Sequence, residues 1–303
     1  MKRPEGKVFG RFGIVNIVKW LELSVQVPSE FVEPVSYLFG RYGRGFSIED
    51  VGGKEVLLRT YLTSTSKQRR ARIEVGVKLI GILKPIQGLS VREIDGIDWQ
   101  EAWKEHFTLL RAGRSLVIKP PWTPYVARDG DLVIELDPGL AFGTGHHPTT
   151  LMCLEELEVL ARPGMRVLDL GAGSGILSIA AVRLGVGTVM ALDVDPTAVK
   201  VARRALKSNG VKDMVKLACG TLPQKLAPEG TFDLAVANIS SKVVQDRAQD
   251  LHHCLKTGGK LVASGFLDRQ EQGVKDRLEE VGFVFQRRRT IDDWVTLVYS
   301  KGE

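Results

Sequence analysis

The sequence contains few cysteines, and their arrangement excludes a disulfide-based fold. The three thiols, Cys153, Cys219 and Cys254, are widely spaced and odd in number. Disulfide-dependent secreted domains carry a dense, even set of cysteines instead. Free thiols suit a reducing compartment, so we expect a cytoplasmic protein.

Long apolar runs and metal-ligand patterns are also missing. No uninterrupted apolar segment approaches the roughly 20 residues of a membrane span, and no apolar core follows the charged first residues as in a signal peptide. The five histidines include two adjacent pairs, His146-His147 and His252-His253, and neighbours on a chain rarely hold one metal ion together. We expect no membrane partner and no metal.

Charge is unevenly distributed along the chain. Residues 1–114 hold 19 Lys and Arg against 13 Asp and Glu, whereas residues 115–303 hold 23 of each. A basic front part is compatible with an RNA-rich setting, and equally with an ordinary solvated surface. The charge balance does not decide between the two, and direct contact with nucleic acid is not expected.

At 303 residues the chain is long for one compact domain, so two domains are expected. Over residues 1–98, period-2 alternation predicts strands at 20–27, 46–48, 56–61 and 91–94, and helical periodicity predicts helices at 28–40 and 67–82. The order β-α-β-β-α-β predicts a ferredoxin-like α+β domain, a fold that often recognises partners.

A linker helix is predicted over residues 99–114, and an α/β domain over 115–303. The two tryptophans Trp99 and Trp103 either anchor a contact between domains or pack into the second core. After residue 115, strand patterns alternate with helix patterns, which indicates a parallel sheet with helices on both faces. The chain ends in a hairpin of residues 283–288 and 294–300 around Asp292-Asp293.

A glycine-rich turn follows the first strand of this alternation. Residues 167–170 are an apolar strand that runs into Gly171, Gly173 and Gly175, and then into a helix. Backbone without Cβ atoms at the carboxyl end of a parallel strand can approach a bulky ligand closely. A dinucleotide-binding fingerprint requires glycine at the sixth position, which is Ile176, so that alternative fails. The spacing resembles instead the first motif of Rossmann-like methyltransferases.

The next strand ends on an acidic residue. Asp193 follows the apolar strand 189–192, at the distance of about 20 residues where an acid accepts hydrogen bonds from ribose hydroxyls. Asp195, before Pro196, is a second candidate but suits a helix N-cap better. No basic neighbour is present to bind a 2′-phosphate, which excludes NADP.

Asn238 ends a later strand, in the context Ala237-Asn238-Ile239. Many methyltransferases that act on nitrogen place an Asn-Pro-Pro-aromatic motif here, whose carboxamide oxygen accepts a hydrogen bond from the acceptor amine. In this chain Asn238 is kept while Ile239-Ser240 replaces the prolines. The alternative is that Asn238 serves only as a turn residue at the strand end.

Residues 136–150 carry the most specific pattern: Leu-Asp-Pro-Gly-Leu-Ala-Phe-Gly-Thr-Gly-His-His-Pro-Thr-Thr. This segment closely resembles the signature of ribosomal protein L11 methyltransferases (PrmA). The Asp-Trp-x-x-x-Trp-Lys segment at 98–104, the Ala-Asn-Ile site at 237–239 and Ser-Gly-Phe at 264–266 are similar too. The resemblance covers the chain from Trp20 onward, and departures occur at His146 and at Ser240-Ser241.

The resemblance implies a Rossmann-like class I methyltransferase domain with a mostly parallel seven-stranded sheet, and S-adenosylmethionine as cofactor. It implies ribosomal protein L11 as the protein substrate, held by the N-terminal domain, and Asn238 as the residue that orients the acceptor amine. The loop at 136–150 would cover the cofactor as a lid. The expected cofactor contacts are Thr150, Gly171, Gly173, Asp193, Asn238, Phe142, Gly143 and Thr144.

The implied reaction is an in-line displacement by a neutral amine, on lysine ε-amines and as a second candidate the α-amine. A lysine amine has a pKa near 10.4, so about one in a thousand is neutral at pH 7. Candidates for a general base are His146, His147 and Asp137. Two alternatives remain: a protein-lysine methyltransferase with a different substrate, and a cofactor-binding ribosome-assembly factor without transfer activity.

Overall fold

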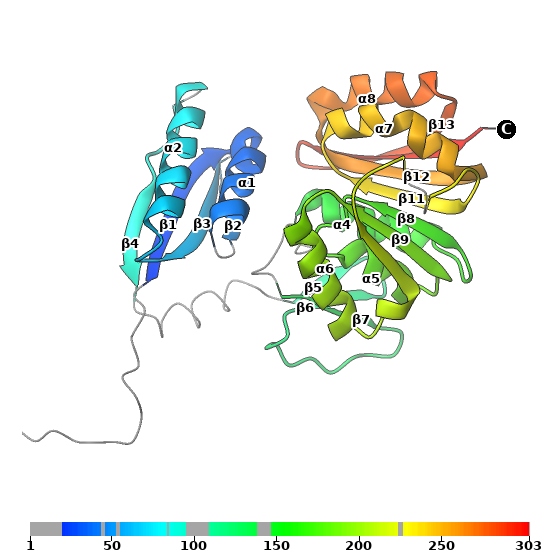
Figure 1. The fold of residues 1–303 in the computed structure, drawn as a ribbon, viewed down its shortest axis with the longest axis horizontal. Helices are drawn as coiled ribbons and strands as arrows, with labels where there is room; N and C mark the ends of the chain where they lie inside the picture. The colour runs from blue at the N-terminus through cyan, green and yellow to red at the C-terminus, as the bar shows by residue number, and fades with distance from the viewer. Residues whose placement is uncertain are drawn as a thin grey trace, which may run out of the picture. The chain divides into compact units, whose positions relative to one another are not determined.

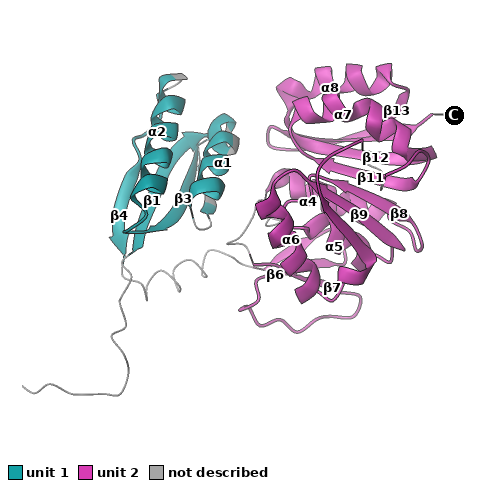
Figure 2. Ribbon diagram, viewed as in Figure 1, with its two compact units in different colours: residues 1–106 teal, residues 107–303 magenta. Residues whose placement is uncertain are grey.

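The chain folds into two compact units, residues 1–106 and 107–303 (Figure 2). The computed structural model describes residues 20–43, 46–52, 55–83, 85–94, 109–137, 147–223 and 227–302. Most of the predicted linker helix, including both of its tryptophans, lies outside the described residues. Its last part is wrong, because Leu110–Ala112 form strand β5, which pairs with the next strand.

The N-terminal unit has the predicted ferredoxin-like fold. Its four strands form an antiparallel sheet in the order β2-β3-β1-β4. Alternate residues of the first strand, Leu23, Val25 and Val27, are buried against Phe39 and Ile73 of the two helices. The elements are β1 (Trp20–Pro28), the 3-10 helix η1 (Ser29–Phe31), α1 (Val32–Tyr42), β2 (Phe46–Gly52), β3 (Glu55–Thr63), α2 (Lys67–Leu83) and β4 (Ser90–Ile94).

The second unit contains the predicted mostly parallel seven-stranded sheet, in the order β10-β9-β8-β11-β12-β14-β13. Only β14 runs antiparallel to its neighbours, which confirms the terminal hairpin. The sheet elements and their helices are α4 (Pro148–Leu160), β8 (Arg166–Leu170), α5 (Ile176–Arg183), β9 (Thr188–Asp193), α6 (Pro196–Ser208), the 3-10 helix η2 (Lys212–Met214), β10 (Val215–Cys219), β11 (Phe232–Asn238), α7 (Ser241–Cys254), β12 (Leu255–Leu267), α8 (Asp268–Glu280), β13 (Phe283–Ile291) and β14 (Trp294–Lys301).

Helices cover both faces of this sheet (Figure 1). One apolar core joins the sheet to α4, α5 and α6, and a second core joins it to α7 and α8. Helix α8 escapes sequence-based prediction because it is strongly polar: Val274 and Leu278 are its only fully buried apolar residues. Two apolar residues one turn apart suffice to hold a helix against a sheet without producing a clear periodic pattern.

A small three-stranded sheet precedes α4 and was not predicted from the sequence. Its strands are β5, β6 (Leu116–Lys119) and β7 (Leu132–Glu135), of which the last two run parallel. Their short apolar runs give little periodicity, and they are stabilised by packing Leu116 and Ile134 into the core that contains α4 and α5.

Ion pairs tie the edge strand β13 to the helices on both faces. Glu156 of α4, whose side chain is only 2% exposed, accepts hydrogen bonds from Arg287, and Arg289 lies 3.6 Å from its second oxygen. On the opposite face Arg288 pairs with Glu271 of α8 at 2.8 Å. Because successive side chains of a strand point to opposite faces, three consecutive arginines bind both helix layers.

Loss of Glu156 should destabilise the protein markedly. Glu156→Ala leaves two arginines without their buried partner, so we expect a loss of about 1–3 kcal/mol in the free energy of unfolding. Urea denaturation of the purified protein measures it. The exposed pair of Arg277 and Glu280 provides the control, since Glu280→Ala should cost less than about 0.5 kcal/mol. Equal effects of the two variants would show that the buried pair does not secure β13.

Candidate active site

The candidate site lies where the strand order of the large sheet reverses. Strands β8 and β11 are parallel neighbours, and Leu170 is paired with Ala237. From β8 the chain winds outward through β9 and β10, and from β11 it winds the other way through β12. Ligands of open α/β sheets bind at the carboxyl ends of the strands at such a reversal. Here these ends carry Gly171 and Asn238, so two residues predicted from separate motifs come together.

The glycine turn after β8 is held by hydrogen bonds to the neighbouring strand end. The N–H groups of Gly171 and Ala172 both donate to the carbonyl oxygen of Leu192, at 2.8 and 3.0 Å. Gly171, Gly173 and Gly175 have positive φ values of 83°, 53° and 83°, a conformation that other residues adopt only with strain. The predicted turn is therefore present, and its glycines are required by backbone geometry.

The carboxylate of Asp193 lies beside this turn. One oxygen accepts a hydrogen bond from the N–H of Gly173 at 2.8 Å, and the other accepts from the N–H of Asp195 at 2.9 Å. Each oxygen retains a further acceptor position, which suits the two adjacent hydroxyls of a ribose. Asp195 instead caps α6, as the sequence indicated, by accepting from the N–H of Thr197 at 2.7 Å.

Asn238 and Thr150 form the other side of the site. The side-chain N–H of Asn238 donates to the Thr150 hydroxyl at 3.2 Å. The side-chain oxygen of Asn238, Oδ1, is buried, and no described residue donates a hydrogen bond to it. A buried acceptor without a partner costs about 1–3 kcal/mol, so its presence indicates a ligand that donates a hydrogen bond here.

Comparisons with known proteins agree with this geometry. The family model for ribosomal protein L11 methyltransferases (PrmA) matches residues 19–302. The chain is 39% identical to the ribosomal protein L11 methyltransferase of Chloroflexus aurantiacus, over 95% of this chain and 99% of that protein. It is 37% identical to the enzyme of the same name from Herpetosiphon aurantiacus, over 94% and 99%. The chain belongs to the PrmA family.

A solved structure supports the same assignment. The crystal structure of ribosomal protein L11 methylase from Lactobacillus delbrueckii subsp. bulgaricus matches with a TM-score of 0.60 and 31% identity, over 65% of this chain and 100% of that one. The fold is that of a class I methyltransferase, and S-adenosylmethionine is its cofactor. The site fits this group, since it offers a glycine turn for close approach, a carboxylate for ribose hydroxyls and an unpaired amide oxygen.

A buried carboxylate under the glycine turn was assigned no role from the sequence. Asp169 is 1% exposed, and one of its oxygens accepts from the Ser178 hydroxyl at 2.6 Å while no described residue donates to the other. Burial, with a smaller effect of the nearby Asp193 charge, raises the pKa of Asp169 to about 6. The sequence signal was its position as the first residue of the Asp-x-Gly-x-Gly-x-Gly pattern that resembles the first methyltransferase motif.

Of the three general-base candidates, Asp137 and His147 lie among the described residues. Phe142, Gly143, Thr144 and His146 lie outside the described residues, and Asp137 is exposed. His147 is the N-cap of α4: its Nδ1 accepts from the N–H of Thr149, which assigns the proton to Nε2. His147 also packs edge-on against Trp294, with ring centroids 4.5 Å apart. These two contacts, a helix cap and an aromatic packing contact, are structural.

Within the described ranges, no cluster of three or more His, Cys, Asp or Glu residues is arranged to hold a metal ion. In the same ranges, no helix combines the length and apolar character needed to cross a membrane.

The partly buried imidazole of His147 should make stability depend on pH. Burial lowers the pKa of His147 to about 4, so the unfolded chain binds a proton near pH 6.5 that the folded chain does not. This contribution is complete above pH 6.5 and is lost as the pH falls towards 4. Between these values the free energy of unfolding should fall by about 1–3 kcal/mol more in the wild type than in His147→Asn.

Urea titrations at several pH values measure this difference. Asparagine is chosen because it caps helices well but does not titrate in this range. The comparison uses the change with pH in each protein, so a constant loss from the Trp294 contact does not affect it. Parallel curves for the two proteins would contradict the prediction.

Proposed function

We propose that the protein transfers methyl groups from S-adenosylmethionine to amino groups of ribosomal protein L11, chiefly lysine ε-amines, with the α-amine as a second acceptor. The observation that carries the proposal is the buried side-chain oxygen of Asn238, which lacks a donor among the described residues. Asn238 ends the strand that pairs with the strand before the Gly171 turn. Relatives that match over nearly the whole chain are named for L11. The cytoplasm, where ribosomes are made, remains the predicted location.

The cofactor contacts are proposed from the same geometry. Asp193 would accept hydrogen bonds from the ribose hydroxyls. The main-chain atoms of Gly171 and Gly173 would lie against the cofactor. Thr150 would contact the cofactor beside Asn238. The predicted contacts of Phe142, Gly143 and Thr144 fall on residues outside the described ranges and stay predictions.

In the proposed reaction the main task of the protein is to position a neutral amine. When bound, S-adenosylmethionine supplies an electrophilic methyl group on its sulfonium sulfur. Asn238 would accept a hydrogen bond from the amine, and so aim the nitrogen lone pair towards that methyl group. The bond to Thr150 holds the carboxamide so that its oxygen, and not its N–H group, is left for the amine. Such positioning can lower the activation free energy by roughly 7–11 kcal/mol.

Substitution of Asn238 tests the proposal. With purified L11 as substrate, Asn238→Ala should lower the single-turnover rate by roughly tenfold or more while cofactor affinity changes less, because aiming the lone pair matters only in the transition state. Asn238→Asp should bind the protonated amine but react slowly, since a carboxylate favours the charged form. Mass spectrometry of the product identifies the methylated residues.

The outcomes separate the alternatives. Rates within about twofold of the wild type for both variants would make Asn238 a turn residue. A wild-type protein that leaves L11 unmodified but labels another protein in a cell extract would assign a different substrate. Cofactor binding without any transfer would favour the assembly-factor alternative.

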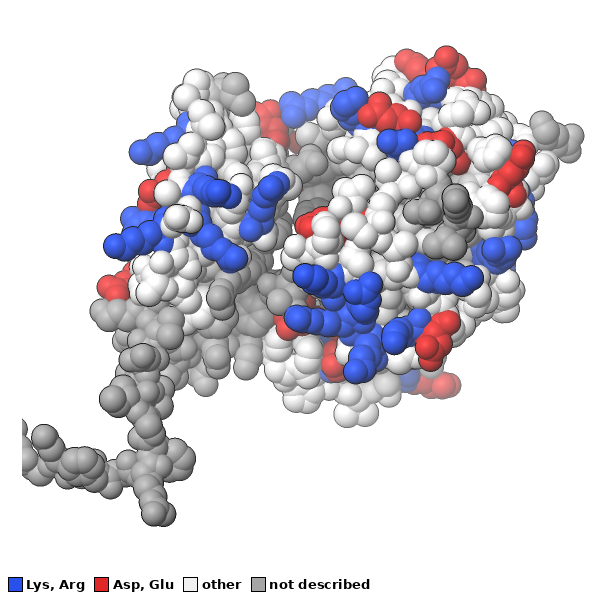
Figure 3. Space-filling view, in the orientation of Figure 1, with Lys and Arg blue, Asp and Glu red and all other residues white. Residues whose placement is uncertain are grey.

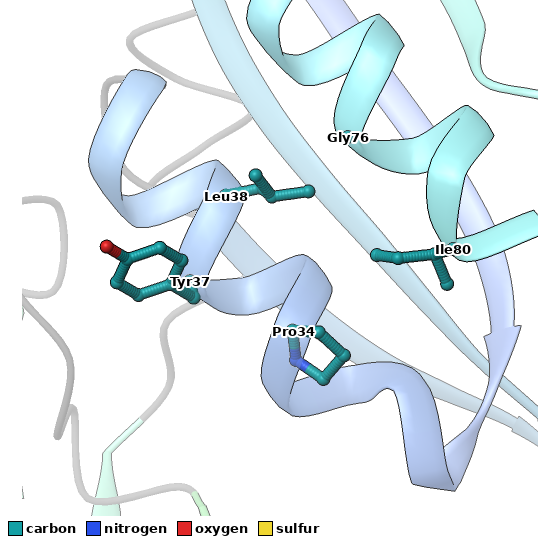
Figure 4. Close-up of a pocket in the computed structure, with 5 residues that line it drawn as sticks. All are labelled: Pro34, Tyr37, Leu38, Gly76 and Ile80. Carbon is teal, nitrogen blue, oxygen red and sulfur yellow. The ribbon is translucent and has the colours of Figure 1, made fainter.

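The N-terminal unit carries a groove suited to holding the substrate. It lies between α1 and α2, has a volume of about 520 Å³ and is lined by Pro34, Tyr37, Leu38, Gly76 and Ile80 (Figure 4). A Cβ atom at Gly76 would lie 2.5 Å from a Leu38 methyl, so glycine lets Leu38 of α1 pack closely against α2 at the floor of the groove.

A separate stripe of exposed apolar side chains runs along α2. Val75, Leu79 and Ile82 are 56%, 59% and 78% exposed and recur on one side of the helix, away from the buried Ile73, Val77 and Ile80. Basic residues outnumber acidic ones on α2, and Figure 3 shows mainly Lys and Arg, with some Asp and Glu, on the visible face of the N-terminal unit. We therefore propose that residues 1–98 recognise L11, through an apolar segment of L11 flanked by acidic residues, while residues 115–303 carry out transfer.

A change in the groove should affect the use of L11 and leave the cofactor site unchanged. Tyr37 is 59% exposed and contacts the Arg41 guanidinium, 5.6 Å from the ring centroid. Tyr37→Ser should raise the KM for L11 by about fivefold or more, because aromatic side chains often dominate binding at such surfaces. The affinity for S-adenosylmethionine, measured by calorimetry, should not change. The control is Val126→Ser, an exposed apolar residue of the other unit. Equal KM values for both variants would show that the groove does not bind L11.

A further inference from the structure

Ile239, directly after Asn238, lies between two glycines from separate parts of the chain. Its N–H donates to the carbonyl oxygen of Ser264 at 2.9 Å. Asn238 and Ser264 are the last paired residues of β11 and β12, so this bond continues the pairing one residue further. The backbone on the acceptor side of the site is therefore held on β12.

The first glycine, Gly265, presses against the backbone of Ile239. Gly265 has a φ of 96° and lies at an irregularity where the register of β12 and β14 shifts between Ser264 and Phe266. A Cβ atom at Gly265 would lie 2.5 Å from the carbonyl oxygen of Ile239 and 2.7 Å from its nitrogen. Only a residue without a Cβ atom fits this close to the Ile239 backbone, whose nitrogen is already hydrogen-bonded to Ser264, so Ile239 packs directly on β12.

The second glycine, Gly171, lies against the Ile239 side chain. A Cβ atom at Gly171 would lie only 2.2 Å from the Cγ2 methyl of Ile239. The Gly171 N–H is bonded to Leu192, so the turn cannot move freely either. The branched methyl of one side chain therefore separates the cofactor turn from the strand end that carries Asn238.

We infer that Ile239 is a positioning residue whose Cγ2 methyl sets the distance between the Gly171 turn and Asn238. The inference rests on the proposed function, in which Gly171 contacts the methyl donor and Asn238 the acceptor. The β-branched side chain suits this role because its χ1 angle is restricted, so the methyl has a defined position. Since a misplacement of about 1 Å can cost 10²-fold in rate, a loss of this methyl should appear in kcat.

Three substitutions separate positioning from space filling. Ile239→Val keeps both branches at Cβ and loses only Cδ1. Ile239→Leu keeps the side-chain volume but has no methyl on Cβ, and Ile239→Ala lacks the methyl without adding bulk elsewhere. We expect kcat to fall roughly tenfold or more in the Leu and Ala variants and less than about threefold in Val. The Kd for S-adenosylmethionine and the KM for L11 should change less than about threefold in all three.

A space-filling role would give a different order. The Leu variant conserves volume, so it would then be the most active of the three. The matched control is Ile134 of β7, which is fully buried in the small sheet. Ile134→Leu and Ile134→Val should shift the thermal midpoint, and kcat should remain the same in both as in the wild type. If Ile239→Leu fails to fold, Ile239→Met takes its place, because methionine also lacks a methyl on Cβ and nearly conserves the side-chain volume.

The results that overturn the inference are distinct from a failure of the proposed function. An active wild type with Ile239→Leu as fast as Ile239→Val would remove the positioning role. Losses confined to cofactor affinity would do the same. A wild type that does not methylate L11 would instead refute the proposed function itself, whatever the variants do.

Discussion

The site depends on the parallel pairing of β8 with β11 at the centre of the large sheet. This pairing brings the Gly171 turn and Asn238, which lie far apart in the sequence, to the same edge. The strand order reverses here, so the helices after the two strands cover opposite faces and leave the carboxyl ends open between them. β9 then adds Asp193, and β12 adds the bulge at Gly265 that closes on Ile239. Each functional group is positioned by its place relative to this one pair of strands.

The site combines a rigid backbone with polar atoms that lack partners. Hydrogen bonds fix the glycine turn to Leu192, the Asp193 carboxylate to Gly173 and the Asn238 amide to Thr150. The Asn238 oxygen and one Asp169 oxygen nevertheless remain without donors among the described residues. Buried acceptors of this kind reduce the stability of the free protein, and they are maintained because the surrounding packing holds them in place. A ligand that supplies donors regains this free energy on binding.

Division into two units separates recognition from chemistry in the proposed function. The N-terminal unit buries Leu23, Val25 and Val27 between its sheet and helices, yet leaves Leu79 and Ile82 of α2 exposed. Its core therefore does not need these side chains, and their exposure on one helix face favours a role in binding. In the second unit, by contrast, the edge strand β13 is tied by arginines to both helix layers, which stabilises the sheet on which the site is built.

Sequence alone predicted both fold classes and the glycine turn, and it placed Asp193 and Asn238 at strand ends, because each depends on local pattern: periodicity, glycines after an apolar strand, and polar residues at strand ends. Helix α8 and strands β5 to β7 were missed because their short apolar stripes acquire meaning only when packed against a core. The site's finer geometry was decided by tertiary structure. The capping role of His147, the unpaired oxygen of Asn238 and the place of Ile239 between two glycines all follow from contacts between segments distant in sequence, and no local pattern encodes such contacts.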